Sequence, residues 1–184
     1  DRAGPQVPED VVERIARRSG GNAFFAEELA GADPDGLPDG LADLLLARTE
    51  RLGEPARALL RLVSVADDRV RHGLLAAASG LHTDELEHAL REAVTHHVLV
   101  PAGEDAYSFR HALLREAVHD DLLPGERTWL HARFADALAG AADEPGAAAD
   151  LARHALAAHD LPRALAASVC AAREADRRYG PAEV

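Results

Sequence analysis

The 184-residue chain has no lysine and no methionine, and it has one cysteine, Cys170. Without lysine, the sequence cannot contain the phosphate-binding loop GxxxxGK[ST] of P-loop ATPases. A lone cysteine cannot form an internal disulfide, which favours a reducing compartment such as the cytoplasm. Cys170 lies among alanine and valine on an expected helix, so we expect a small, buried side chain there. Because the chain starts at Asp1 and lacks methionine, we expect it to be a piece of a longer protein.

Aromatic residues make up only 4% of the chain, although 47% of its residues are hydrophobic. Much of the hydrophobic content is alanine, which favours closely packed helices over a bulky sheet core. No apolar run approaches the ~18 residues of a membrane-spanning helix, and no signal peptide is evident. We therefore expect a soluble, cytoplasmic, mainly α-helical protein with no membrane partner.

All 20 basic residues are arginine, and 32 acidic residues give a net charge of −12. An acidic surface repels the phosphate backbone, so we expect no direct binding of nucleic acid. The histidines are not spaced as zinc ligands and no cysteine pair assists them, so we expect no metal site. No nucleophile and base stand together in the sequence, and we expect no catalytic residues.

Hydrophobic residues recur at helical spacing along most of the chain. A helix that starts at Pro8 should end at the pair Gly20 and Gly21, after which Asn22 can cap the next helix, 23–30. Pro38 should begin a longer helix that reaches Leu52. Thr83 should cap the helix 84–96, and Pro124 should lie in a break between helices. Further helices are expected over residues 56–66, 72–78, 112–122, 126–139, 147–159 and 162–178.

One segment gives a convincing β signal, because residues 98–100 and 106–109 flank a turn and predict a hairpin. Three helices followed by such a hairpin are typical of a winged helix, which we place at residues 54–109. The loose link 140–146 is the preferred domain boundary. The two alanine-rich helices beyond it predict an antiparallel pair of the kind that stacks in helical solenoids, so further repeats should follow.

Several segments resemble the signal-transduction ATPases that include the large ATP-binding regulators of the LuxR type. Residues 17–29, RRSGGNAFFAEEL, are similar to the SxGNPFFxEEL segment of the helical lid in these proteins. Residues 44–52, LLLARTERL, resemble the stretch that follows it. Residues 107–118, YSFRHALLREAV, resemble the more specific FxFRHALLREAVY segment, and RTWLH at 127–131 follows as in the family. The tail after Gly146 resembles the start of a tetratricopeptide-like solenoid.

The resemblance implies three parts. Residues 1–52 would be the C-terminal part of the lid, 53–140 a winged helix with following helices, and 141–184 the start of the repeats. The family implies a P-loop core elsewhere in the protein that binds ATP or ADP, whereas the isolated fragment would bind no cofactor and catalyse nothing. Its partners would be that core and a protein or small-molecule inducer on the solenoid, and its output would be transcription regulation in many family members.

The resemblance also implies site residues. His111 would touch the β-phosphate of ADP and hold a closed, inactive state, with Arg110 beside it. Two alternatives remain open: His111 merely caps the helix that follows, and Arg110 pairs with Glu116 or another acid.

A second candidate site is the turn formed by Gly20, Gly21 and Asn22, which in the family lies against adenine. The same residues would also serve as an ordinary helix stop and cap. Ala23 stands where the family has proline, which removes a rigid wall from this contact. Of the aromatic residues, we expect at least one of the adjacent phenylalanines at 24 and 25 to be core. Trp129 and Phe134 should pack between the winged helix and the solenoid.

Two functions follow from these observations. The first is a regulatory switch, in which His111 reads the nucleotide state of the ATPase core and the lid and winged helix move together. It predicts that His111 faces the turn at Gly21 and Asn22. The second is a helical adaptor for protein binding with no nucleotide role. It predicts that His111 is buried or randomly placed and that an apolar groove lies on the solenoid side.

Overall fold

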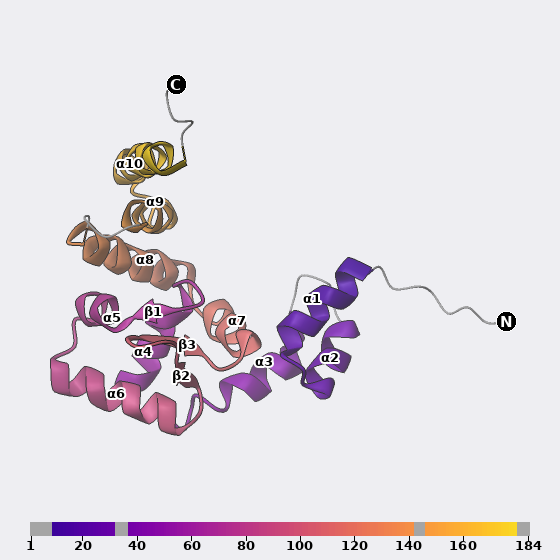
Figure 1. The fold of residues 1–184 in the computed structure, drawn as a ribbon. Coiled ribbons are helices and arrows are strands. Elements are labelled where there is room, and N and C mark those ends of the chain that lie inside the picture. Colours follow the sequence, from indigo (N-terminus) through magenta and orange to yellow (C-terminus); the bar gives the residue numbers. More distant parts are fainter. Residues whose placement is uncertain (1–8, 32–36, 142–145, 180–184) are drawn as a thin grey trace.

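The computed structural model describes residues 9–31, 37–141 and 146–179. Within these ranges the chain forms ten α-helices and one small three-stranded antiparallel sheet (Figure 1). The mainly helical class predicted from the sequence is therefore confirmed. Residues 32–36, between the helices expected at 23–30 and from Pro38, and most of the link expected at 140–146 lie outside the described residues.

Three helices precede the central unit: α1 (Glu9–Ser19), α2 (Ala23–Ala30) and α3 (Asp39–Leu46). The helix expected to run from Pro38 to Leu52 is thus too long by six residues at its C-terminal end. Beyond Leu46 the backbone forms tight turns, such as Thr49 N–H to Leu46 O at 2.7 Å. The Thr49 hydroxyl also donates to that carbonyl at 2.8 Å, where α3 gives way to these turns.

The central unit combines three helices with the sheet. Its sheet order is β1-β3-β2, with β3 paired antiparallel to both neighbours. The short strand β1 was not predicted, since two residues carry no alternating pattern. The bounds are α4 (Glu54–Ser64), β1 (Val70–Arg71), α5 (His72–Ser79), α6 (Thr83–Thr95), β2 (Leu99–Pro101) and β3 (Ala106–Phe109).

The start of α6 differs by one residue from the prediction. His82, not Thr83, is the N-cap. The carboxylate of Glu85 accepts a hydrogen bond from the His82 N–H at 3.2 Å, which closes the first turn onto the preceding residue. At the other end of the α5–α6 connection, Gly80 ends α5 with a φ of +63°, a left-handed conformation that favours glycine.

Helix α7 (Ala112–Asp120) lies between the N-terminal helices and the central unit (Figure 1). Its buried face packs against α3 and α4, and it also contacts α1 and β3. That face consists of Leu113, Leu114, Ala117 and Val118. All four belong to one apolar core that extends from Phe25 in α2 to Phe134 further along the chain.

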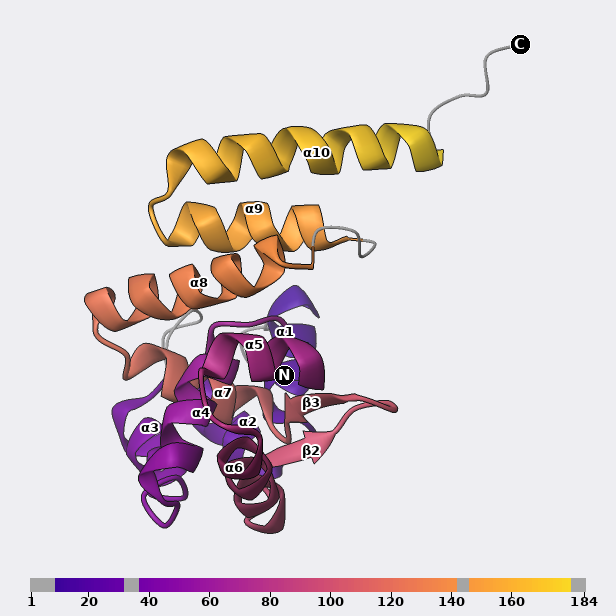
Figure 2. The ribbon, with the colours of Figure 1, turned by 90° about the vertical axis from the view of Figure 1, so that its left-hand side faces the viewer.

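The last three helices, α8 (Pro124–Ala139), α9 (Ala147–Ala157) and α10 (Leu161–Tyr179), stack as successive layers (Figure 2). Pro124 begins α8 instead of separating two helices, because the first turn of a helix needs no N–H from proline. Helix α8 packs on α5 on one side and on α9 on the other. It therefore joins the central unit to the helix pair.

Three side chains on these helices test sequence expectations. Phe134 is fully buried, as expected, but Trp129 is 55% exposed and lies 4.8 Å from the guanidinium of Arg133. Cys170 is exposed, which contradicts the buried side chain expected from its apolar neighbours. Its sequence neighbours are small and apolar, as expected. However, α10 contacts α9 with one side only, and Cys170 lies away from that side.

A histidine pair joins α8 to α9. Nδ1 of His131 and Nδ1 of His154 are 2.9 Å apart, so one ring donates and the other accepts. The ring of Phe134 lies 4.8 Å from that of His154, which is 2% exposed. Burial, followed by the charge of Arg153, lowers the pKa of His131 to about 4 and that of His154 to about 3. Both rings are therefore neutral in the folded chain at neutral pH.

The histidine pair predicts that the folded chain becomes less stable as the pH is lowered. The unfolded chain takes up these protons below about pH 6.5 and the folded chain does not, so stability is lost as pH falls from about 6.5 towards 4. We expect the free energy of unfolding to drop by roughly 2 kcal/mol per histidine between about pH 7.5 and 5. Chemical denaturation at both pH values measures it.

The double variant His131→Gln, His154→Leu should show a much smaller loss over the same pH interval. His88→Gln, an exposed position on α6, is the matched control and should keep the wild-type loss. If the double variant and the wild type lose the same stability, the pair does not titrate as the structure implies.

Candidate functional site

His111 stands at the junction of β3 and α7 and is the N-cap residue of α7. Its carbonyl oxygen accepts hydrogen bonds from the N–H groups of Leu114 and Arg115, at 3.1 and 3.3 Å. Within the described residues, its side chain makes no cap hydrogen bond. The backbone of His111 thus starts the helix, which leaves the imidazole available for another contact.

The imidazole of His111 lies edge-on to the ring of Phe25, with ring centroids 6.4 Å apart and planes at 83°. Phe25 is buried in the first turn of α2, one helical turn after Asn22. Partial burial, followed by the charges of Arg110 and Arg48, lowers the pKa of His111. The ring is therefore neutral near pH 7 and keeps one N–H donor.

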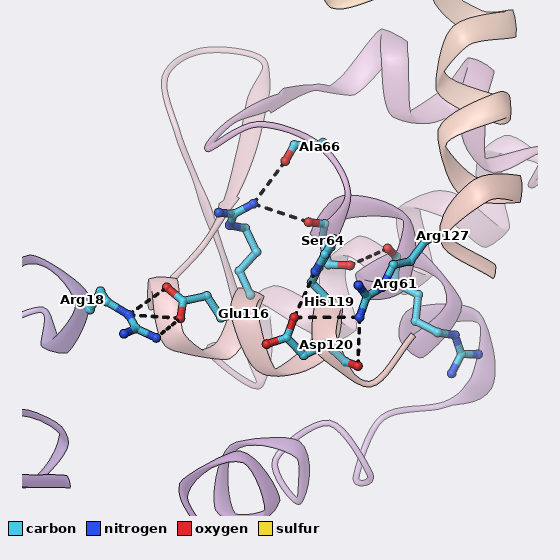
Figure 3. A network of polar contacts seen from close by, with 9 residues as sticks. Arg18, Arg61, Ser64, Ala66, Glu116, His119, Asp120 and Arg127 are labelled. Atoms are coloured by element: carbon cyan, nitrogen blue, oxygen red, sulfur yellow. Dashed lines mark hydrogen bonds and ion pairs between the residues drawn. The ribbon is translucent and has the colours of Figure 1, made fainter. Parts of the chain in front are cut away.

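Arg110 is exposed, and its backbone N–H donates to the carbonyl of Val98 at 3.0 Å. Pairing of Arg110 with Glu116 was one alternative from the sequence, and it is wrong. Glu116 instead pairs with Arg18 of α1, with Nη2 and Oε2 2.6 Å apart and a second bond from Nε at 3.2 Å (Figure 3). Arg110 makes no ion pair among the residues that the structure describes, and its charge lowers the pKa of His111.

The turn at Gly20, Gly21 and Asn22 is exposed and connects α1 to α2. The glycines have φ values of +57° and +82°, and a Cβ at either position would meet no described atom within 4 Å. The oxygen of Asn22 accepts a hydrogen bond from the N–H of Phe24 at 3.1 Å. The chain itself thus uses these residues as a helix stop and a cap.

The structure brings some of the sequence-predicted site residues together. His111 lies against the first turn of α2, directly after the Gly20–Asn22 turn, and Arg110 is close enough to shift its pKa. The imidazole contacts Phe25 of α2 rather than the turn itself. Ala23 begins α2 in place of the proline of the family pattern.

A cleft that sequence reasoning missed lies between α1 and the corner of β3 and α7. Its volume is about 620 Å³. We name it the arginine cleft, because its lining includes Arg14, Arg17, Arg18, Arg69 and Arg115 beside two carboxylates, Asp68 and Glu116. The spacing of residues 14, 17 and 18 places three arginines on one helical face and could have been noticed. The other two come from distant segments.

Neither a metal cluster nor a membrane span is found in the part of the chain that the structure describes. No group of three or more His, Cys, Asp or Glu residues is arranged to hold a metal ion there. No described helix has the length and apolar character needed to cross a bilayer. No protein-family model, no curated protein and no solved structure matches the chain.

The Arg18–Glu116 pair predicts a measurable coupling between α1 and α7. The two side chains are 15% and 28% exposed, so the pair is shielded from solvent. We expect a double-mutant cycle with Arg18→Ala and Glu116→Ala to give a coupling of about 1–2 kcal/mol in the free energy of unfolding.

The matched control is the ion pair of Arg57 with Glu54, whose side chains are 37% and 61% exposed. Its coupling should be about 0.5 kcal/mol or less, because water screens it. Equal couplings for the two pairs would mean that Arg18 and Glu116 do not hold α1 against α7.

Proposed function

We propose that this chain is a regulatory part of an ATP-dependent signalling protein of the LuxR type, with a role in transcription regulation. In this proposal α1–α3 are the end of an ATPase lid, residues 54–109 are a winged helix, and α8–α10 begin a tetratricopeptide-like solenoid. A P-loop core elsewhere in the same protein binds ATP or ADP, and His111 reads which nucleotide is bound. The chain itself catalyses nothing.

The position of the His111 imidazole carries this proposal. It lies between the first turns of α2 and α7, where backbone N–H groups and helix dipoles favour an anion. Arg110 and Arg48 add positive potential, as their effect on the pKa of His111 indicates. A phosphate oxygen placed there would accept the imidazole N–H and draw the two helices together.

The connections of α7 suggest how the contact would be transmitted. Helix α7 is separated from α8 by three residues, 121–123, and α8 packs on both α5 and α9. A shift of α7 on release of the phosphate would therefore move the base of the helix stack. An inducer that binds the stack in only one of its positions would bias the same equilibrium.

A helical adaptor remains the second candidate, and one observation favours it. An apolar groove of about 470 Å³ lies along α9 and α10. Leu156, Leu161 and Leu165 in this groove are 59%, 62% and 69% exposed. Such a surface suits a protein partner and requires no nucleotide.

The nucleotide role of His111 is tested by calorimetric titration of ADP into the full-length protein that carries the ATPase core. His111→Ala should weaken ADP binding tenfold or more, about 1.4 kcal/mol. His111→Phe should weaken it similarly, because it keeps a ring against Phe25 but lacks the N–H donor. His97→Ala, an exposed position on the loop before β2, is the control and should bind ADP as the wild type does.

The two His111 variants separate a phosphate contact from a packing role. If His111→Phe binds ADP normally and only His111→Ala is impaired, the ring is structural and the sensor role is wrong. If both bind ADP normally, the adaptor function is the better description. ATP hydrolysis by the isolated chain would contradict both.

A further inference from the structure

The arginine cleft differs from the rest of the molecule in its charge balance. The chain has 32 acidic residues against 20 arginines, yet five arginines and only two carboxylates line this one cleft. Several arginines outside the cleft pair with a nearby acid, as in the pairs of Arg153 with Asp67 and of Arg163 with Asp136. A basic hollow in an acidic protein is therefore a local feature and not a result of composition.

Three of the five arginines have no partner among the described residues. Arg18 pairs with Glu116, and Arg115 donates to the carbonyl oxygens of Ser64 and Ala66 at 3.5 and 3.4 Å (Figure 3). By contrast, Arg14, Arg17 and Arg69 make no ion pair or side-chain hydrogen bond to any described residue. Their charges remain available to a ligand.

The available arginines stand on two walls. Arg14 and Arg17 are one turn apart on α1, whereas Arg69 belongs to the segment before β1, and all three line the cleft. Successive side chains of an extended peptide point to opposite sides. Acidic side chains on such a peptide could therefore reach both walls at once.

The sheet adds a reason for an extended ligand. Strand β1 pairs only with Ala106 and Tyr107 of β3, so Ser108 and Phe109 continue past its end. Both of these residues line the cleft, where Phe109 and Ala112 supply an apolar surface. Extended peptides commonly bind along a strand beside pockets for their side chains.

We propose that the arginine cleft binds an extended acidic segment of a partner protein. Its carboxylates pair with Arg14 and Arg17 on one wall and with Arg69 on the other, and its backbone runs past Ser108 and Phe109. Asp68 and Glu116 stand among the arginines, which disfavours a compact polyphosphate whose charges are concentrated at one point. A peptide can place neutral side chains opposite these acids. This site is separate from the contact of His111 with Phe25 and does not depend on the proposed nucleotide role.

Binding is measured by fluorescence anisotropy with the intact chain and two labelled peptides of equal charge, without nucleotide. One alternates glutamate with threonine and stays extended, and the other spaces glutamates with alanine and favours a helix. We expect the extended peptide to bind more tightly, with an affinity that falls as salt is raised. Tighter binding of the helical peptide would overturn the proposal.

Charge reversal locates the site. The double variant Arg14→Glu, Arg17→Glu should weaken binding of the extended peptide at least tenfold. The single variant Arg69→Glu, on the opposite wall of the cleft, should also weaken it. The matched control, Arg173→Glu, Arg177→Glu, makes the same change of net charge on exposed positions of α10, a helix that lies well away from α1 (Figure 1). It should leave the affinity within about twofold. Equal losses in both double variants would show non-specific attraction and overturn the proposal.

Two further measurements keep the result unambiguous. Arg14→Gln, Arg17→Gln removes the charges without adding repulsion, and it should weaken binding less than charge reversal while the thermal unfolding temperature stays near that of the wild type. Inorganic triphosphate is the competitor for a phosphate site. If it displaces the peptide at lower concentration than an unlabelled copy of the peptide does, the cleft is a phosphate site and the acidic segment is not its ligand.

Discussion

The rest of the structure depends on the packing of one helix, α7. Its apolar face, formed by Leu113, Leu114, Ala117 and Val118, contacts α3 and α4, so the N-terminal helices and the central unit share one core. Its polar side carries Glu116, which reaches Arg18 of α1, and Arg115, which bonds to the turn after α4. Because α7 follows β3 after two residues, its direction also sets the position of His111. Displacement of α7 would thus alter the core, the α1 contact and the candidate site together.

The strength of these contacts is unequal. Helix α3 is held against α7 by buried leucines, and burial of such side chains contributes about 1.5–3 kcal/mol each. Helix α1 packs on α2 and α7, and Ser19 is its one buried residue among those described. The Arg18–Glu116 ion pair joins it to α7. Helix α1 is therefore held less firmly than α3, and a ligand could move it at lower cost.

Much of the fold could be predicted from local pattern, because most helices begin or end at a residue with a backbone preference. Gly20 and Gly21 stop α1, Gly80 stops α5, and apolar periodicity identified the remaining helices and the β2–β3 hairpin. The misses depend on contacts that local pattern does not contain. Strand β1 exists only through pairing with β3, and the early end of α3 coincides with a hydrogen bond from the Thr49 hydroxyl to Leu46 O. In the candidate site, the position of His111 at the junction of strand and helix was predicted. The Arg18–Glu116 and His131–His154 pairs were not, because they join residues that are 98 and 23 positions apart in the sequence.

The candidate site and the arginine cleft lie next to each other on the corner of β3 and α7, and this adjacency has a mechanical consequence. His111 contacts Phe25 of α2, while Arg14 and Arg17 of α1 line the cleft, and α1 and α2 pack on each other. A ligand in either place would favour the arrangement in which α1 and α2 lie close to α7. Two ligands that favour the same arrangement assist each other's binding by the same factor, since coupling between sites is reciprocal. The Arg18–Glu116 pair joins α1 to α7 and limits the size of this effect. The pair already holds α1 and α2 close to α7 when no ligand is bound. Each ligand can therefore shift this equilibrium only by its own difference in affinity between the two arrangements, acting on the fraction that is not yet closed.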